Sequence, residues 1–120
     1  VNAQGLLHPI HKFNDNYYLI TREGDTFKAL GKEIEISWRK LAKYNERDKN
    51  DVLHRGEVIY LKKKRKKAPK QYKNRPHIVR NGESMYTISQ KYGIRLKYLY
   101  KMNNFDVDHQ IKIGDRIRIR

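Results

Sequence analysis

The sequence contains no cysteine, no long hydrophobic run and few acidic residues relative to basic ones. The absence of cysteine excludes structural disulfides, zinc ribbons and thiol nucleophiles. No stretch approaches the ~20 consecutive apolar residues that a membrane-spanning helix needs, so we expect a soluble chain. The chain begins with Val and shows no signal peptide, and we therefore expect it to be a fragment of a longer protein.

Basic residues dominate the charge. The 120 residues include 28 Lys and Arg against 13 Asp and Glu, a formal net charge of +15. A chain this basic is attracted to polyanions, which include nucleic acid, anionic membrane surfaces and acidic wall polymers. Salt weakens such attraction steeply, so the charge by itself predicts no specific site.

An internal repeat organises the chain. Shifting the sequence against itself by 58 positions aligns two copies of one pattern without a gap. The aligned pairs include Gly24 with Gly82, Thr26 with Ser84, Phe27 with Met85, Leu30 with Ile88, Leu41 with Leu99, Asn45 with Asn103 and Gly56 with Gly114. The repeat predicts two similar units of roughly 45 residues, near the lower limit at which an apolar core stabilises a fold.

The first copy reads as strand, helix, helix, strand. We expect a strand at 18–21, a turn at 22–25, and a helix capped by Thr26 that buries Phe27, Leu30 and Ile34. A second helix follows the cap Ser37, and Asn45 is expected to end it in a left-handed conformation. Gly31 inside the first helix predicts a close approach of neighbouring backbone. The strand at 58–61 must return antiparallel to the first strand if so short a unit is to close.

The second copy repeats this plan with Ser84 as the first cap. Arg95 stands where the first copy has Ser37, so we expect the second helix of this copy to start without a side-chain cap. In the final segment, 116–120, Ile117 and Ile119 should point inward and the arginines outward.

The flanking segments are read as non-core. We expect a tail or linker at 1–17, the first unit at 18–62, a linker at 63–76 and the second unit at 77–120. Six consecutive basic residues at 62–67 and the prolines Pro69 and Pro76 predict a self-repelling, extended linker, with a polyanion-binding patch as the alternative. His8 and His11 lack a third metal-ligand candidate nearby, so we expect no metal site.

Both units resemble LysM domains. The resemblance rests on the Gly-Asp/Glu-Thr/Ser turn, the two helices, the Asn that follows them and the closing pattern Ile-x-x-Gly-x-x-Ile-x-Ile, and it covers about three quarters of the chain. It implies an α+β fold of two βααβ units, each with a two-stranded antiparallel sheet packed by two helices. It also implies binding of N-acetylglucosamine-containing polymers, peptidoglycan or chitin, outside the cytoplasm, with no cofactor.

The resemblance also implies where the sugar binds, in a shallow groove between the turn before the first helix and the loop before the last strand. In the first copy the groove residues would be Gly24, Asp25, Thr26, Phe27, Asn50, Asp51, Val52 and Leu53. In the second copy they would be Gly82, Glu83, Ser84, Met85, Asp108, His109, Gln110 and Ile111. The glycines also suit the turns, Thr26 and Ser84 suit helix caps, and Phe27 and Met85 suit the core, so the location is predicted more firmly than any side chain.

Tandem LysM repeats are similar to the C-terminal targeting region of a glucosaminidase-type peptidoglycan hydrolase, which would make this chain a non-catalytic anchor. A glycosidase is the first rival, but Glu33 and Glu35 lie among Lys and Arg at a helix end, where both carboxylates stay ionised. A nucleic-acid binder is the second rival, because basic residues interleaved with nine tyrosines could follow a single strand. Salt dependence separates that reading from the binding of a neutral sugar.

Overall fold

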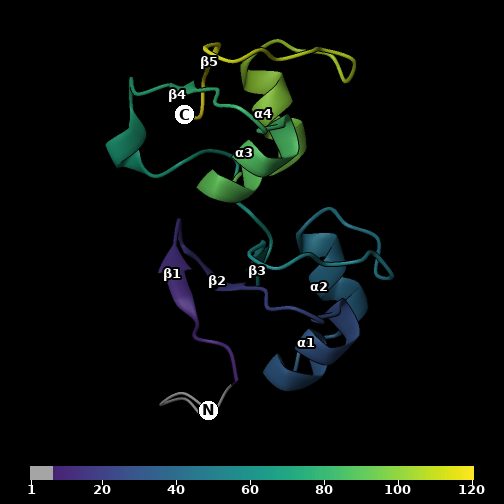
Figure 1. Ribbon diagram of the computed structural model, residues 1–120. Coiled ribbons are helices and arrows are strands. Elements are labelled where there is room, and N and C mark those ends of the chain that lie inside the picture. The colour runs from purple at the N-terminus through teal and green to yellow at the C-terminus, as the bar shows by residue number, and fades with distance from the viewer. Residues whose placement is uncertain (1–6) are drawn as a thin grey trace. The chain divides into compact units, whose positions relative to one another are not determined.

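The computed structural model describes residues 7–120, and the chain divides into two compact units, residues 1–64 and 65–120. Each unit contains a βααβ arrangement with its own apolar core, and the elements are labelled in Figure 1. The α+β fold predicted from the repeat is therefore confirmed. Among the described residues, no helix combines the length and apolarity needed to cross a membrane.

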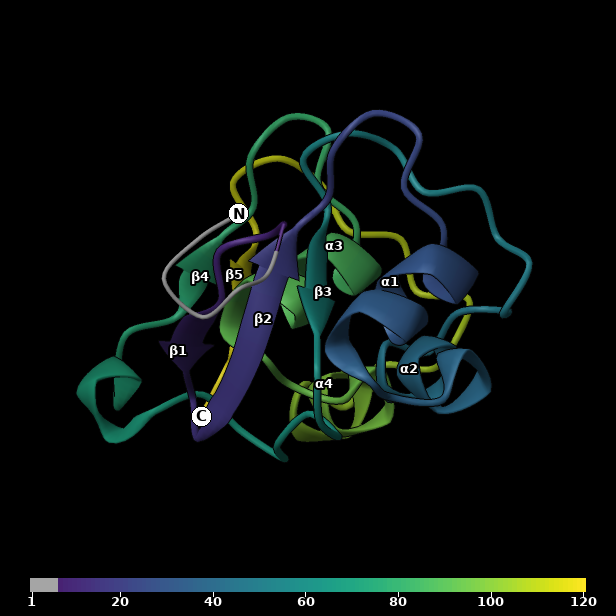
Figure 2. The ribbon, with the colours of Figure 1, turned by 90° about the horizontal axis from the view of Figure 1, so that it is seen from below.

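Unit 1 has a three-stranded antiparallel sheet in the order β1 (His11–Phe13), β2 (Asn16–Ile20) and β3 (Val58–Tyr60). Leu19 lies opposite Ile59 in the β2–β3 register. Figure 2 shows these strands side by side, with the helices α1 (Phe27–Ile34) and α2 (Trp38–Tyr44) to one side of them. The core of the unit is a cluster of fully buried side chains that includes Phe27, Leu30 and Leu41.

Strand β1 corrects the prediction of a tail or linker at 1–17, of which 1–6 lie outside the described residues, and the prediction of a two-stranded sheet in this unit. It pairs with β2, with His11 opposite Tyr18 and Phe13 opposite Asn16. The link between the two strands is Asn14-Asp15, with both residues at positive φ (51° and 53°), as a tight hairpin turn requires. Asn14 and Asp15 therefore form a hairpin turn inside the segment that was expected to be a tail or linker.

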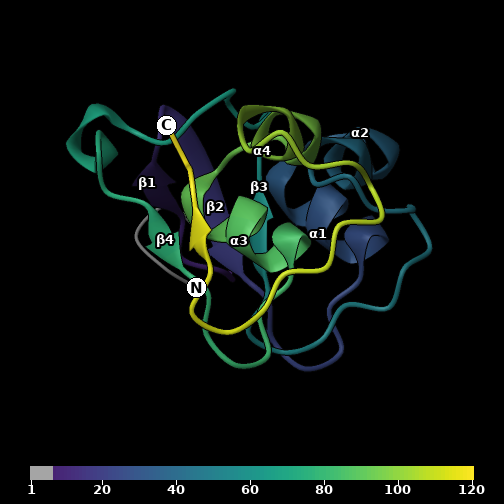
Figure 3. The ribbon, with the colours of Figure 1, turned by 90° about the horizontal axis from the view of Figure 1, so that it is seen from above.

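Unit 2 has a two-stranded sheet of β4 (His77–Ile78) and β5 (Arg116–Ile117), packed with α3 (Met85–Tyr92) and α4 (Leu96–Met102). Figure 3 shows the two strands next to each other. Ile117 and Ile119 are buried whereas Arg116 and Arg118 are exposed, as the alternation predicted. Ser84 caps α3, and Arg95 provides no side-chain cap for α4, also as predicted.

The prediction that residues 63–76 form an extended linker is wrong. The amide of Arg65 donates to Gly93 O (2.9 Å), the amide of Arg95 donates to Arg65 O (2.8 Å) and the amide of Ala68 donates to Ile119 O (2.8 Å). Ala68 is 1% exposed within the unit 2 core, and a short 3₁₀ turn, η1 (Lys70–Tyr72), follows it. The backbone, the small apolar side chain of Ala68 and the buried Lys64, which pairs with Glu46, fix this segment, and its other basic side chains remain exposed.

Asn45 has a different role from the predicted left-handed stop. Its φ is −102°, and the left-handed residue is the next one, Glu46 (φ 54°). The Asn45 side chain instead donates to Leu41 O and Tyr60 O and accepts from Tyr60 N, so it joins the end of α2 to β3. Asn103 makes the same three bonds to Leu99 and Arg118 in unit 2.

The glycine inside α1 is explained by close packing. A Cβ atom at Gly31 would lie 2.6 Å from Ile36 O and 3.0 Å from the Cα of Trp38. These distances are shorter than real Cβ contacts allow, so only glycine fits where α1 meets the start of α2. The close approach expected from the sequence is confirmed.

Candidate functional site

The first wall of the candidate groove in unit 1 is the turn before α1. Gly24 takes a positive φ of 84°, and the amide of Asp25 donates to Arg22 O. The Asp25 carboxylate closes the turn by accepting from Arg22 N at 2.7 Å. Thr26 then caps α1, with its hydroxyl accepting from Ala29 N, as predicted. The first N–H groups of a helix have no partner within the helix, so this wall presents backbone donors.

The second wall is the loop before β3, and a network centred on Arg47 holds it. The guanidinium of Arg47 contacts Asp51 (2.8 Å) and Glu57 (2.7 Å), and also donates to Val52 O (3.2 Å). The hydrogen bond from Arg47 lowers the pKa of the Asp51 carboxyl. The guanidinium of Arg47 is thus paired with two carboxylates of the same loop.

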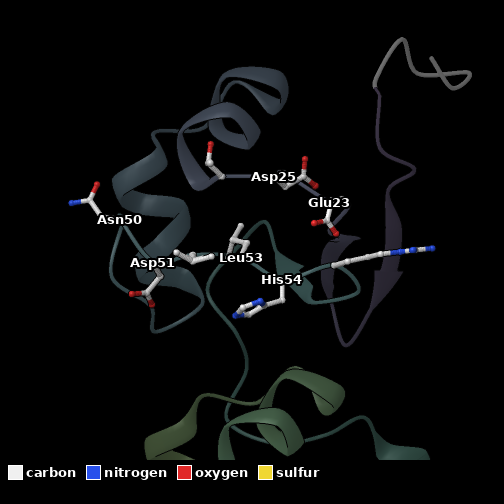
Figure 4. A pocket seen from close by; sticks show the side chains of 10 residues that line it. Glu23, Asp25, Asn50, Asp51, Leu53 and His54 are labelled. Atoms are coloured by element: carbon white, nitrogen blue, oxygen red, sulfur yellow. The ribbon is translucent and has the colours of Figure 1, made fainter.

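These two walls enclose one cavity of about 410 Å³ in unit 1. Leu53, only 6% exposed, is the buried apolar part of the lining, and Val52 beside it is 74% exposed. Figure 4 shows Leu53 between the turn of Asp25 and the loop of Asp51, with the Asn50 amide pointing away. The lining residues are Glu23, Gly24, Asp25, Thr26, Asn50, Asp51, Val52, Leu53, His54 and Arg55.

Seven of the eight residues expected in the first groove therefore line the same cavity. The exception is Phe27, which does not line the cavity and is completely buried in the core. The sequence reading missed Glu23, His54 and Arg55, which extend the two walls at their ends. Their adjacency to the expected residues is the signal that could have found them.

A buried histidine supports the first wall from behind. His8 is 4% exposed; its Nε2 lies 2.7 Å from Asp25 Oδ2 and its Nδ1 lies 2.9 Å from Glu33 Oε1. The Asp25 carboxylate is thus shared between the turn amide and this ring, which makes it a structural group of the turn. Among the described residues, no cluster of His, Cys, Asp and Glu could hold a metal ion.

Unit 2 builds the same wall with a histidine from a different sequence position. Glu83 accepts from Arg80 N at 2.7 Å, and its Oε1 lies 2.8 Å from Nε2 of the buried His77. The repeat aligns His77 with Leu19, so His8 and His77 are not equivalent in sequence. Burial raises the pKa of Glu83, but hydrogen bonds from His77 and the Arg80 amide outweigh it, and the pKa lies below its usual value. His77 Nδ1 lies 2.7 Å from the hydroxyl of Tyr92, whose pKa is raised by burial.

Of the other residues expected in the second groove, Gly82 takes a positive φ of 82° in the turn. Ser84 accepts from Thr87 N as the helix cap, and Met85 is 4% exposed in the core. In the facing loop Asp108, His109 and Gln110 are exposed, and Ile111 packs partly buried against the core.

An aromatic stack takes the place of the Arg47–Asp51 ion pair in unit 2. The repeat aligns Arg47 with Phe105 and Asp51 with His109, and these two rings stack with centroids 3.6 Å apart. Both loops are thus fixed by contacts four residues apart, but the unit 2 loop carries fewer charges. The two candidate grooves share a plan and differ in surface chemistry.

Comparison with known proteins identifies the repeated unit. The sequence profile of the LysM domain matches residues 20–62 and 77–120, most of the chain. Among solved structures, the chain is similar to the spore cortex-lytic enzyme SleL of Bacillus cereus (22% identity, TM-score 0.36) and of Bacillus megaterium QM B1551 (20% identity, TM-score 0.34). The similarity covers 86% and 85% of this chain but 22% of each enzyme, so the chain spans about a fifth of their length. No curated protein matches the sequence.

Proposed function

Because this chain belongs to the LysM family and carries two copies of its domain, we propose that it binds N-acetylglucosamine-containing polymers without catalysing a reaction on them. Peptidoglycan is the proposed target, and chitin offers the same sugar. The observation that carries the proposal is the cavity of unit 1, which the two expected loops form together.

The chemistry of the cavity suits an acetamido sugar. Such a sugar presents an amide N–H, a carbonyl oxygen and a methyl group. Turn carbonyls and amides can pair with the first two, and the apolar surface of Val52 and Leu53 can cover the methyl group. The ion pairs of Arg47 with Asp51 and Glu57 keep the loop in shape.

The carboxylates near the cavity argue for binding over hydrolysis. A glycosidase needs one carboxyl group with a raised pKa and a second at a set distance across the scissile bond. Of the three carboxylates that line the cavity, Asp25 is engaged by His8, Asp51 by Arg47, which lowers the pKa of Asp51, and Glu23 is exposed to solvent. Glu33, outside the lining, is also engaged by His8. The rival proposal based on Glu33 is weakened because its carboxylate is committed to a buried contact.

The proposed cellular role is to anchor a larger protein to the cell wall outside the cytoplasm. A glucosaminidase-type peptidoglycan hydrolase would be a suitable parent protein, because two binding units on one chain hold a repeating glycan more firmly than one. In this role the chain supplies targeting and another part of the parent protein supplies catalysis.

Binding of soluble chitin oligomers and retention on insoluble peptidoglycan, each at low and high salt, test the proposal. The variants Val52→Asp and Gln110→Asp change the same repeat position in unit 1 and unit 2. Each should weaken binding by about tenfold, because a charge then faces an apolar sugar surface. Leu7→Asp is the matched control, because Leu7 is also exposed but does not line the cavity.

The sugar groove is supported if the chain is retained on peptidoglycan at high salt, if the combined variant Val52→Asp/Gln110→Asp abolishes this retention, and if the control Leu7→Asp preserves it. Unit 1 alone binds if only Val52→Asp has an effect. Release by salt alone, or equal binding by all variants, would contradict the proposed sugar site.

A further inference from the structure

The positive charge of the chain is concentrated in unit 2. Residues 65–120 contain fifteen Lys and Arg against four acidic residues, a net charge of +11, whereas residues 1–64 contain thirteen against nine, a net charge of +4. Between Glu57 and Asp106 the only acidic residue is Glu83, which is engaged by His77. A neutral glycan does not account for this asymmetry.

A second cavity, of about 210 Å³, lies within unit 2 and is separate from the residues of the expected groove. It is bounded by the end of η1 with the segment after it, and by the C-terminal residues beyond β5, which lie near each other in Figure 3. No acidic residue lines it, and three arginines do. The lining residues are Tyr72, Asn74, Arg75, Pro76, Arg118, Ile119 and Arg120.

Backbone hydrogen bonds fix two of these arginine side chains. Arg120 Nη1 donates to Ala68 O at 2.7 Å, and Arg118 Nε donates to Arg120 O at 3.0 Å. Arg75 is held through its own backbone amide, which donates to Tyr72 O. No Asp or Glu side chain within the described part of the chain pairs with any of the three side chains. Guanidinium groups held in place with donors to spare are suited to oxyanions, which they bind through two parallel hydrogen bonds.

The repeat shows that two of the arginines lining this cavity have no counterpart in unit 1. The positions of Arg75 and Arg118 correspond to Tyr17 and Tyr60 in unit 1, where Tyr60 is buried. Residues 16–18 of unit 1 pair with β1, whereas β4 starts only at His77, after Pro76, and has no third strand beside it. Unit 2 therefore has the two arginines and lacks the third strand, whereas unit 1 has two tyrosines at those positions and has the third strand.

We propose that this cavity binds the phosphate groups of a polyol-phosphate polymer of the cell wall. Its volume accommodates a tetrahedral phosphate and part of a flexible polyol, and its three guanidinium groups supply charge and hydrogen-bond donors. The site is independent of the sugar groove and gives unit 2 a second ligand.

Nucleic acid also carries phosphodiesters, but Tyr72, the aromatic residue that lines this cavity, and the cation-rich ring of Tyr98 already have partners. Tyr72 packs edge-on against Tyr92. The ring of Tyr98 already has three cations near it, those of Lys66, Arg95 and Lys97, at 5.2–5.6 Å from its centroid. Single-strand binding depends on free aromatic faces, so the chemistry favours a polymer recognised by its phosphates alone.

Fluorescence anisotropy with a labelled glycerol-phosphate oligomer of eight phosphates, at near-physiological salt, tests the site in the full chain. The double variant Arg75→Gln/Arg118→Gln should bind at least about tenfold more weakly. Lys97→Gln/Lys101→Gln is the matched control, because it removes two charges from exposed positions on α4 outside the cavity and should cost no more than about threefold. Arg75→Lys/Arg118→Lys should give an intermediate loss, because lysine keeps the charge but not the paired donors.

If the glutamine variant and its matched control lose affinity for the oligomer equally, diffuse attraction explains the binding and the proposed site is wrong. Unchanged affinity of the glutamine variant would also overturn the proposed site. A single-stranded thymidine oligomer with eight phosphates is the second probe. If it binds as tightly and with the same dependence on Arg75 and Arg118, the polyol-phosphate assignment is wrong. Chitin-oligomer binding should be unchanged in all these variants, so failure here is distinguishable from failure of the sugar groove.

Discussion

Replacing Asn45 with alanine tests whether a single buried amide joins α2 to the sheet of unit 1. The side chain is fully buried and makes three hydrogen bonds, at 2.8 Å to Leu41 O, 2.9 Å to Tyr60 O and 2.7 Å from Tyr60 N. Alanine removes all three bonds and leaves buried backbone groups of β3 without that partner. Each such group costs about 1–3 kcal/mol, so we expect unit 1 to lose about 3 kcal/mol.

The repeat supplies a matched comparison in Asn103→Ala. Asn103 makes the same bonds at 2.8, 2.9 and 2.7 Å, but it is only partly buried and its bonds to Arg118 are exposed to solvent. Water can replace the lost partner there, so we expect a loss of about 1 kcal/mol. The difference between the two variants isolates the contribution of burial, because the hydrogen-bond geometry is the same.

Urea unfolding followed by Trp38 fluorescence measures the unit 1 variant, since Trp38 is the single tryptophan and packs against the unit 1 core. Scanning calorimetry of both variants measures the unit 2 loss. A unit of this length has a total stability of roughly 3–10 kcal/mol, so Asn45→Ala should remove a large part of it. Equal losses in the two variants, or a loss below about 1 kcal/mol for Asn45→Ala, would refute the reasoning.

Two further predictions concern stability. Gly31→Ala should destabilise unit 1 by roughly 1–3 kcal/mol in the same urea assay, because the new Cβ would lie 2.6 Å from Ile36 O, although alanine ordinarily favours a helix. Lys32→Ala, on the exposed side of α1, is the control. A gain in stability of the Gly31→Ala variant would contradict the prediction. Unit 2 should lose stability as the pH falls below about 4.5, the usual Glu value, because the pKa of Glu83 is lower in the folded state and protonation breaks its contacts with His77 and the Arg80 amide. Glu83→Gln should reduce this dependence in thermal unfolding between pH 3 and 6, and an unchanged pH profile would count against it.

Much of the fold follows from the repeat and from local rules. The caps Thr26 and Ser84, the buried stripe that begins at Phe27 and the return strand at 58–60 all lie where the pattern indicates. These features depend on residues near one another in sequence, or on a spacing that occurs twice. The residues that line the cavity of unit 1 were expected together because the LysM resemblance implies a groove between the turn before the first helix and the loop before the last strand.

The features that the sequence did not reveal depend on single long-range contacts. Ala68 gives no periodic signal, yet its insertion into the unit 2 core fixes a segment whose lysines suggested repulsion. The Asn14-Asp15 turn was a hairpin signal, but the short strand before it, at 11–13, lacks an alternating apolar pattern. The buried contacts of His8 and His77 arise from unequal sequence positions, so no comparison of the two copies could show them.

The third strand of unit 1 has a consequence for self-association. The LysM profile begins at residue 20, whereas β1 lies at 11–13 and pairs with β2. The profile therefore leaves out β1 and most of β2; a chain that starts at Asn16, keeping β2 but losing β1, would leave the hydrogen-bonding edge of β2 open to a second copy of itself. In unit 2 the exposed edge is only two residues long and follows Pro76, which has no amide to offer a passing strand. The two copies thus protect their sheets from aggregation in different ways, one by covering the edge and the other by keeping it too short to template.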